Sequence, residues 1–268
     1  MHGDPLRTEF ASVGAILQRS LLSESWCGRL RQSIDRCRDD PSPHYAALSP
    51  AGLPVVDSDL FRWRDDRNLH ELTHSSPLVE LAARLLDCDE VVLVEDQWFA
   101  SAPGANTPSP WHQDQPYYRL DRPFVTIWVT LDDVPRTASL RVVPGSHSTG
   151  TTYAPVEFSA NSATIDGDSG LAPVPDIDTD PSNFDVRSWS LQAGDAIALD
   201  SRALHATGTS PLDRPFRRIS TRWATPATRY VVDVPGAARF WEMLPHDRSH
   251  RDLLACEMFP RVRPAAAS

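Results

Sequence analysis

The sequence contains no lysine: all 26 basic residues are arginines, and they stand against 36 acidic residues. Without lysine, Schiff-base and lysine-nucleophile chemistry are excluded, and an anionic cosubstrate must be bound by arginine or by neutral donors. The net charge of −10 argues against nucleic acid or an anionic membrane as partner, because both are bound through basic patches. We therefore expect the partner to be a small-molecule substrate.

Long apolar runs and paired cysteines are also missing. No run approaches the roughly 20 apolar residues that a membrane span needs, and no basic segment leads into an apolar core as in a signal peptide. We expect a cytoplasmic protein and leave open whether it is a monomer or a homodimer. The scattered cysteines lack zinc-like spacing, so we interpret them as small apolar side chains of a reduced protein. They are Cys27, Cys37, Cys88 and Cys256.

The pattern along the chain predicts one domain over residues 1–268, with no internal repeat. A helical scaffold is expected at about 10–88, a β-rich core at about 90–235 and an irregular tail at 236–268. Residues 148–190 interrupt the core and are rich in Ser, Thr, Asp, Gly and Pro. We expect this insertion to be either a surface loop or a cover over the active site.

Two helices and several short strands are predicted. Apolar spacings of three and four indicate helices at 23–38, after the N-cap Ser23, and at 76–86, which begins Ser76-Pro77. Beyond residue 90 the strands have no helices between them, which predicts a mainly β fold such as a sandwich, barrel or jelly roll. The expected strands are 90–94, 97–100, 123–131, 140–143, 196–199 and 218–223.

The most informative stretch is Trp111-His112-Gln113-Asp114. Side chains at i and i+2 share one face of a strand, so we predict that His112 and Asp114 project from the same strand face. His205 follows an apolar run far downstream and supplies a second imidazole. Two histidines and one carboxylate are typical of non-haem iron(II) oxygenases and leave three coordination positions open. A zinc site accepts the same ligands.

Three further motifs follow in order. The four are Trp111-His112-Gln113-Asp114-Gln115-Pro116, Ile127-Trp128-Val129-Thr130-Leu131-Asp132-Asp133, Val142-Val143-Pro144-Gly145-Ser146-His147 and Leu204-His205-Ala206-Thr207-Gly208. Together they resemble the phytanoyl-CoA dioxygenase (PhyH-like) family of iron(II)- and 2-oxoglutarate-dependent oxygenases. The resemblance covers about residues 10–235 and implies a double-stranded β-helix, a cupin-like jelly roll with flanking N-terminal helices.

The resemblance also implies the site. The family's iron ligands fall on His112, Asp114 and His205, and the cofactors are Fe(II), 2-oxoglutarate and O2. Its 2-oxoglutarate contacts fall on Gln97, Trp128 and Thr207.

The far carboxylate of 2-oxoglutarate needs a cation, and at the position where the family has one this sequence differs. Members commonly have an arginine eleven residues after the distal histidine, where this sequence has Phe216. We favour Arg218, which with Ser220 forms an Arg-x-Ser pattern, over Arg217 and, last, Arg214.

The function that the resemblance implies is oxidation of a small organic molecule, by hydroxylation, in a biosynthetic tailoring step. Asp114 occupies the position that halogenating relatives leave to chloride, so halogenation is not expected. Epimerisation, cyclisation or desaturation with the same cofactors stay open, as does a non-oxidative cupin-type isomerase or hydrolase. Further candidates for the substrate side are Tyr117, Arg119, Trp98, Trp63 and Arg222.

Overall fold

A mostly antiparallel major sheet lies at the centre of the computed structural model, which describes residues 4–105, 107–156, 158, 170–180, 182–235, 241 and 244–265. The strand order is β1-β8-β5-β10-β4-β3-β2, and β11 pairs with β4. The strands are β1 (Ala15–Gln18), β2 (Ala46–Ala47), β3 (Val56–Leu60), β4 (Val91–Ser101), β5 (Val125–Thr130), β8 (Ala196–Asp200), β10 (Phe216–Ala224) and β11 (Arg261–Val262).

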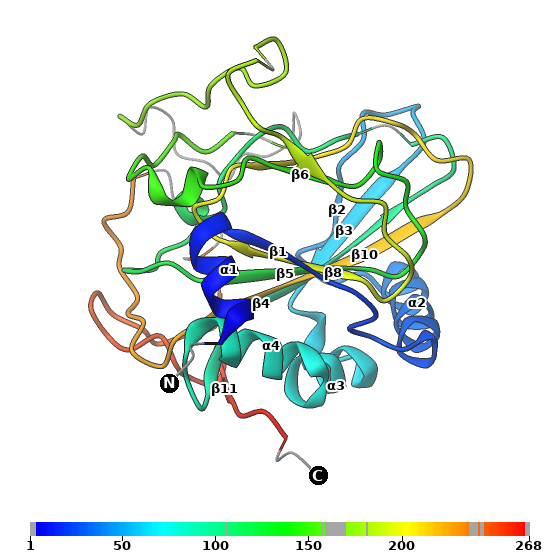
Figure 1. The fold of residues 1–268 in the computed structure, drawn as a ribbon. Helices are drawn as coiled ribbons and strands as arrows, with labels where there is room; N and C mark the ends of the chain where they lie inside the picture. The colour runs from blue at the N-terminus through cyan, green and yellow to red at the C-terminus, as the bar shows by residue number, and fades with distance from the viewer. Residues whose placement is uncertain are drawn as a thin grey trace.

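Helices cover one face of this sheet (Figure 1). They are α1 (Pro5–Val13), α2 (Glu24–Asp39), α3 (Arg67–Ser75) and α4 (Pro77–Leu86), with the short 3-10 helix η1 (Arg62–Arg64) before α3. The side chain of Ser23 caps α2, and Ser76 with Pro77 at the first helical position begins α4. Both predicted helices are therefore confirmed to within one residue, whereas α1 and α3 were not predicted.

A minor sheet faces the other side of the major sheet, and its strand order is β7-β6-β9. It contains β6 (Leu140–Val142), β7 (Arg187–Ser188) and β9 (His205–Thr207). Two further 3-10 helices, η2 (Gln115–Tyr117) and η3 (Ser146–Ser148), lie in the connecting loops. Two opposed antiparallel sheets with N-terminal helices confirm the predicted jelly-roll fold.

The two faces of strand β10 have different surroundings: one faces the apolar core under the helices, and the other faces the interior of the jelly roll. Ile219 and Trp223 are fully buried in the cluster shared with the helices. Phe216, Arg218 and Ser220 alternate with them and therefore face the minor sheet.

One predicted strand boundary was wrong. The runs 90–94 and 97–100 form the single strand β4, because Glu95 and Asp96 between them are buried within the sheet.

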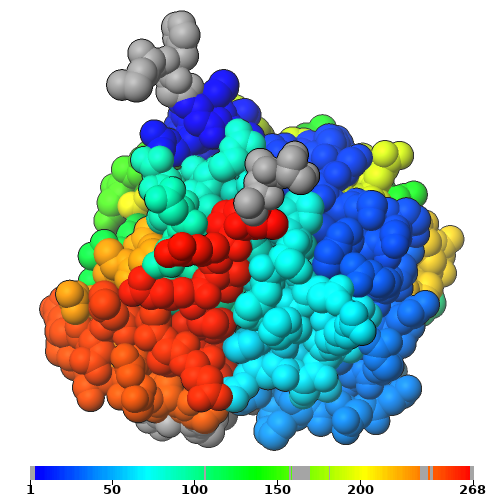
Figure 2. Space-filling view, turned by 90° about the horizontal axis from the view of Figure 1, so that it is seen from below, coloured from blue at the N-terminus to red at the C-terminus, as the bar shows by residue number. Residues whose placement is uncertain are grey.

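The described part of the C-terminal tail packs against the rest of the fold. Figure 2 shows it, in orange and red, beside the cyan helical segment. Trp241, Leu254 and Phe259 join a second core cluster with Tyr118 and Phe124, and β11 extends the edge of β4. Within the described residues, none of the helices has the length and apolar character needed to cross a membrane.

Candidate metal centre

His112, Asp114 and His205 converge inside the jelly roll. Each offers a ligand atom within 4.8 Å of the other two, and all three side chains are buried. Asp114 Oδ1 lies 3.6 Å from Nε2 of His112 and 3.8 Å from Nε2 of His205. The three residues predicted as ligands are thus brought to one point.

The backbone brings the three side chains together in a different way from the predicted strand. His112 forms one antiparallel bridge with His205, in which each residue's N–H donates to the other's carbonyl at 2.9 Å. The chain then turns, and Asp114 has helical dihedrals as the residue before η2. The predicted strand containing both His112 and Asp114 was therefore wrong. The turn, rather than strand alternation, directs the carboxylate toward the histidines.

The protonation of both imidazoles suits metal binding. Nδ1 of His112 lies 2.8 Å from the carbonyl oxygen of Pro110, and Nδ1 of His205 lies 3.0 Å from that of Ala203. A carbonyl only accepts, so each Nδ1 carries the proton and each Nε2 presents a lone pair. Burial, together with His112, lowers the pKa of His205 to about 4 and keeps this imidazole neutral at neutral pH. Nitrogen and carboxylate donors of this kind fit a divalent transition metal.

Asp114 is held as a carboxylate by its surroundings. Burial acts to raise its pKa, but the guanidinium of Arg222 acts against burial and holds the pKa far below its usual range. The hydroxyl of Thr126 donates to Asp114 Oδ2 at 2.6 Å, and Nε of Arg222 lies 3.5 Å from the same oxygen. Oδ1 is left to face the histidines.

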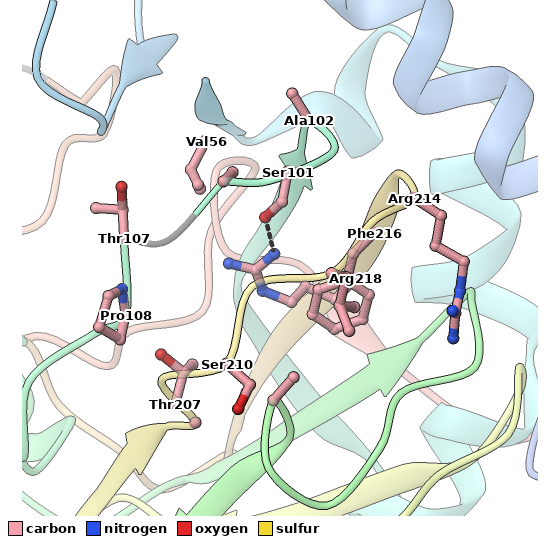
Figure 3. Close-up of a pocket in the computed structure, with 14 residues that line it drawn as sticks. Val56, Ser101, Ala102, Thr107, Pro108, Thr207, Ser210, Arg214, Phe216 and Arg218 are labelled. Atoms are coloured by element: carbon pink, nitrogen blue, oxygen red, sulfur yellow. Dashed lines mark hydrogen bonds between the residues drawn. The ribbon is translucent and has the colours of Figure 1, made fainter. Parts of the chain in front are cut away.

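Arg218 lies in a pocket near this centre (Figure 3). Its side chain is 7% exposed, donates to the hydroxyl of Ser101 at 3.0 Å and lies about 5 Å from the ring centres of Phe99 and Phe216. Thr207 lines the same pocket. Burial lowers the pKa of Arg218 to about 10, so the guanidinium remains charged at neutral pH.

The other two arginines proposed as the cation have different surroundings. Arg217 points to the helical side, where it pairs with Asp35 of α2 at 3.4 Å and with Asp132 at 3.7 Å. Arg214 is at the edge of the pocket, beyond Phe216 in Figure 3, and donates to the backbone carbonyl of Asp133.

Three more residues predicted to contact 2-oxoglutarate form a row across the major sheet. Ser220 pairs directly with Gln97 on β4 and with Trp128 on β5, so the three side chains share the face that carries Arg218. Gln97 donates to the hydroxyl of Ser58, and Trp128 packs near Phe216.

The insertion 148–190 contacts the centre through its described residues, while 157, 159–169 and 181 lie outside the described residues. Asp178 accepts from the indole N–H of Trp111 at 3.1 Å and pairs with Arg141 at 2.6 Å. Ile177 packs on Trp111, behind His112. Nearer the metal ligands, the ring of Phe158 meets that of His112 edge-on at 4.7 Å. Whether the insertion covers the pocket stays a prediction.

Several candidate residues lie away from the cavity. Trp63 and Trp98 are in the core beneath the helices, so their proposed role on the substrate side was wrong. Tyr117 lies near the centre, 6.0 Å from His112 between ring centres. Thr126 and Glu95 contact the centre or its neighbours, yet they were not predicted. Glu95 did carry a signal, as an acidic residue that directly follows the apolar run Val91–Val94.

The chain matches one known protein family in sequence and several solved structures in fold. The sequence profile described as Phytanoyl-CoA dioxygenase (PhyH) matches residues 10–216. Among curated proteins, no sequence matches the chain.

Three solved structures illustrate the similarity in fold. The epimerase SnoN, in complex with Fe3+, alpha ketoglutarate and nogalamycin RO, has 19% identity and a TM-score of 0.77, over 96% of this chain and 97% of its own. The carbocyclase SnoK from nogalamycin biosynthesis has 16% identity and a TM-score of 0.75, over 97% and 96%. EvdO2 from Micromonospora carbonacea var. aurantiaca, complexed with 2-oxoglutarate, has 22% identity and a TM-score of 0.60, over 87% and 95%.

Proposed function

This chain belongs to the phytanoyl-CoA dioxygenase (PhyH) family, and we propose that it oxidises a small organic molecule, by hydroxylation, in a biosynthetic tailoring step. It is a non-haem iron enzyme that uses 2-oxoglutarate and O2 as cosubstrates, as the four motifs predicted. A non-oxidative isomerase or hydrolase does not agree with membership of this family. We assign the iron to His112, Asp114 and His205.

The strongest support for the proposal is that Arg218 is buried without an acidic partner among the described residues. This guanidinium is buried, and within the described part of the chain it makes no ion pair. A buried charge without a counterion is costly, unless an anionic ligand completes the pair. The far carboxylate of 2-oxoglutarate supplies that charge, and a guanidinium with a nearby hydroxyl matches its geometry.

The protein's own groups then have separate tasks. Arg218 and Thr207 hold the far carboxylate, while Gln97, Ser220 and Trp128 line the same face of the sheet between this carboxylate and the metal ligands. When bound, iron with 2-oxoglutarate and O2 supplies an oxidant that removes a hydrogen atom from a C–H bond. In hydroxylation, one oxygen atom of O2 enters the substrate, and 2-oxoglutarate takes the other as it becomes succinate and CO2.

A second reaction type is supported by the structural neighbours. SnoN is described as an epimerase and SnoK as a carbocyclase, and both align with nearly the whole chain. We therefore keep epimerisation and cyclisation, together with desaturation, as alternatives that use the same cofactors. For the same reason, nogalamycin and related natural products are the first substrates to test.

The proposal is tested first without substrate. Anaerobic addition of Fe(II) and 2-oxoglutarate should give a weak visible charge-transfer band at about 500 nm, because 2-oxoglutarate binds such a centre through two oxygens. Absence of this band, together with substrate turnover supported by Zn(II) alone, would refute the proposal.

Mass spectrometry of the product then separates the reaction types. Hydroxylation adds one oxygen atom, epimerisation leaves the mass unchanged, and cyclisation or desaturation removes two hydrogen atoms. Succinate should form in step with the product. Substrate conversion without succinate would contradict the 2-oxoglutarate dependence.

A further inference from the structure

The two oxygens of Asp114 have different environments. Oδ1 faces the histidines, whereas Oδ2 accepts from the Thr126 hydroxyl at 2.6 Å and lies 3.5 Å from Nε of Arg222. Thr126 stands on β5 and Arg222 on β10, and the two residues pair directly across these strands. Oδ2 therefore accepts a hydrogen bond from one strand of the major sheet and lies beside a guanidinium on the neighbouring strand.

Arg222 is itself fixed by a buried partner. Its Nη1 donates to Glu95 Oε1 at 2.6 Å and lies 3.3 Å from the amide oxygen of Gln97. The hydroxyl of Tyr118 donates to the same oxygen of Glu95 at 2.9 Å. Glu95 and Tyr118 are almost completely buried, so this contact is shielded from solvent. The guanidinium thus lies between two carboxyl groups and has little freedom to turn.

We propose that Arg222, held by Glu95 and acting with Thr126, keeps Asp114 a one-oxygen ligand of the metal. Arg222 and Glu95 are positioning residues in this role, because they act through Asp114. The inference rests on the proposed function in one respect: it concerns the same metal centre.

The number of open positions gives the physical reason. Two histidines and a carboxylate that binds through one oxygen leave three positions on a six-coordinate metal. 2-Oxoglutarate takes two of them, and O2 needs the third. A carboxylate that binds through both oxygens leaves only two positions. The hydrogen bond from Thr126 and the positive charge of Arg222 oppose this, because both stabilise negative charge on Oδ2 and make this oxygen a weaker ligand for the metal.

The test uses Co(II) alone as the probe, in two variants. Removal of Arg222 by itself leaves the charge of Glu95 buried without a cation, which is expected to destabilise the fold strongly. The first variant is therefore the double substitution Glu95→Gln and Arg222→Met, which removes both charges together. The second, Thr126→Val, removes the hydroxyl that donates to Oδ2 and leaves every charge in place.

Both variants should bind Co(II) about 10- to 100-fold more weakly, the usual effect of losing a partner behind a metal ligand. Their visible Co(II) spectra should also change, because the coordination number of the metal changes. Arg218→Met is the matched control, since Arg218 is a buried arginine four residues from Arg222 on the same strand face and, within the described residues, it forms no hydrogen bond or ion pair with Asp114. It should keep the parent's Co(II) affinity and spectrum.

Two results would overturn the inference. One is a parent-like Co(II) affinity and spectrum in Thr126→Val, which decides the matter even if the double variant does not fold. The other is a lower melting temperature with unchanged Co(II) binding in the variants. This result would show that Arg222, Glu95 and Thr126 only stabilise the fold. Failure of the proposed function looks different: the parent binds Co(II), but added 2-oxoglutarate does not alter its spectrum.

Discussion

Arg217 and Arg218 are adjacent on β10, yet their side chains lie on opposite faces of the major sheet. Arg217 reaches Asp35 on the helical side, and Arg218 lies in the pocket with Ser101 and Thr207. Two chemically identical side chains, adjacent in the chain, therefore lie on opposite faces of the sheet, and only that of Arg218 is buried in the pocket. This makes the pair a built-in control for the binding of 2-oxoglutarate.

Arg218→Met should raise the KM for 2-oxoglutarate about 10- to 100-fold, because it removes a charge-assisted contact worth roughly 1.5–3 kcal/mol. Arg217→Met should leave this KM unchanged and cost at most about 1 kcal/mol of stability, since its ion pairs are partly exposed. Steady-state kinetics and urea unfolding measure the two effects. The opposite ranking of KM values would transfer the role to Arg217.

His112→Ala should remove metal binding while the protein stays folded. The loss in affinity should exceed the roughly 10- to 100-fold cost of losing an outer partner. His70→Ala is the control, because His70 stacks on His74 at 4.0 Å on α3, outside the metal centre. Equilibrium dialysis with Fe(II) and circular dichroism report on both properties. Full metal binding by His112→Ala would exclude this residue as a ligand.

Asp96 should make the protein less stable at alkaline pH. Burial raises the pKa of this carboxyl to about 8 from an ordinary value of 3.8. Between these values the folded state holds a proton that the unfolded state has lost. The stabilisation is thus complete below about pH 4 and disappears as the pH rises through about 8.

Asp96→Asn should therefore raise the melting temperature more at pH 9 than at pH 5. The asparagine still accepts from the backbone N–H of Trp63 but cannot ionise. Each kcal/mol corresponds to about 2–4 °C in a chain of this size. Differential scanning calorimetry at the two pH values checks the difference. An equal change at both would show that ionisation of Asp96 is not the cause.

Gly14→Ala should cost about 1–3 kcal/mol. Gly14 has a φ of +76°, and an added Cβ would lie 2.4 Å from Nδ1 of His147. Gly28→Ala, in the interior of α2 with nothing within 4 Å of an added Cβ, should instead stabilise the protein by about 0.5–1 kcal/mol. Urea unfolding distinguishes the two signs. Equal effects would mean that the close contact with His147 is relieved without cost.

Local signals predicted much of the scaffold. The caps Ser23 and Ser76 mark the beginnings of α2 and α4, and the β-type runs locate most of the long strands. The convergence of His112, Asp114 and His205 was also predictable, because these residue types occur in the order typical of the family. The Arg-x-Ser pattern favoured Arg218 over Arg217, and strand alternation places only Arg218 on the face toward the interior of the jelly roll. Its role as the cation stays a prediction.

Long-range ion pairs explain what was missed. Strand β3 reads Val-Asp-Ser-Asp-Leu and looks like a loop, yet Asp57 and Asp59 are buried against Arg38 and Arg62. Glu95 ends an apolar run and looks exposed from the sequence. It is buried because Arg222, 127 residues later in the chain, neutralises its charge. No local pattern reveals such a partner. The turn at Asp114 was missed for a similar reason, because the backbone of Gln115, the next residue, is held by the distant carbonyl of Ser201.

The reciprocal backbone bridge between His112 and His205 has a practical consequence. The spacing of the two imidazoles is set by peptide hydrogen bonds that form when the chain folds, so no ion is required to assemble the donors. Metal uptake can then follow folding as a separate event, and little conformational entropy is left to lose at that step. The protein should be purifiable metal-free and be reconstituted afterwards by simple addition of the ion.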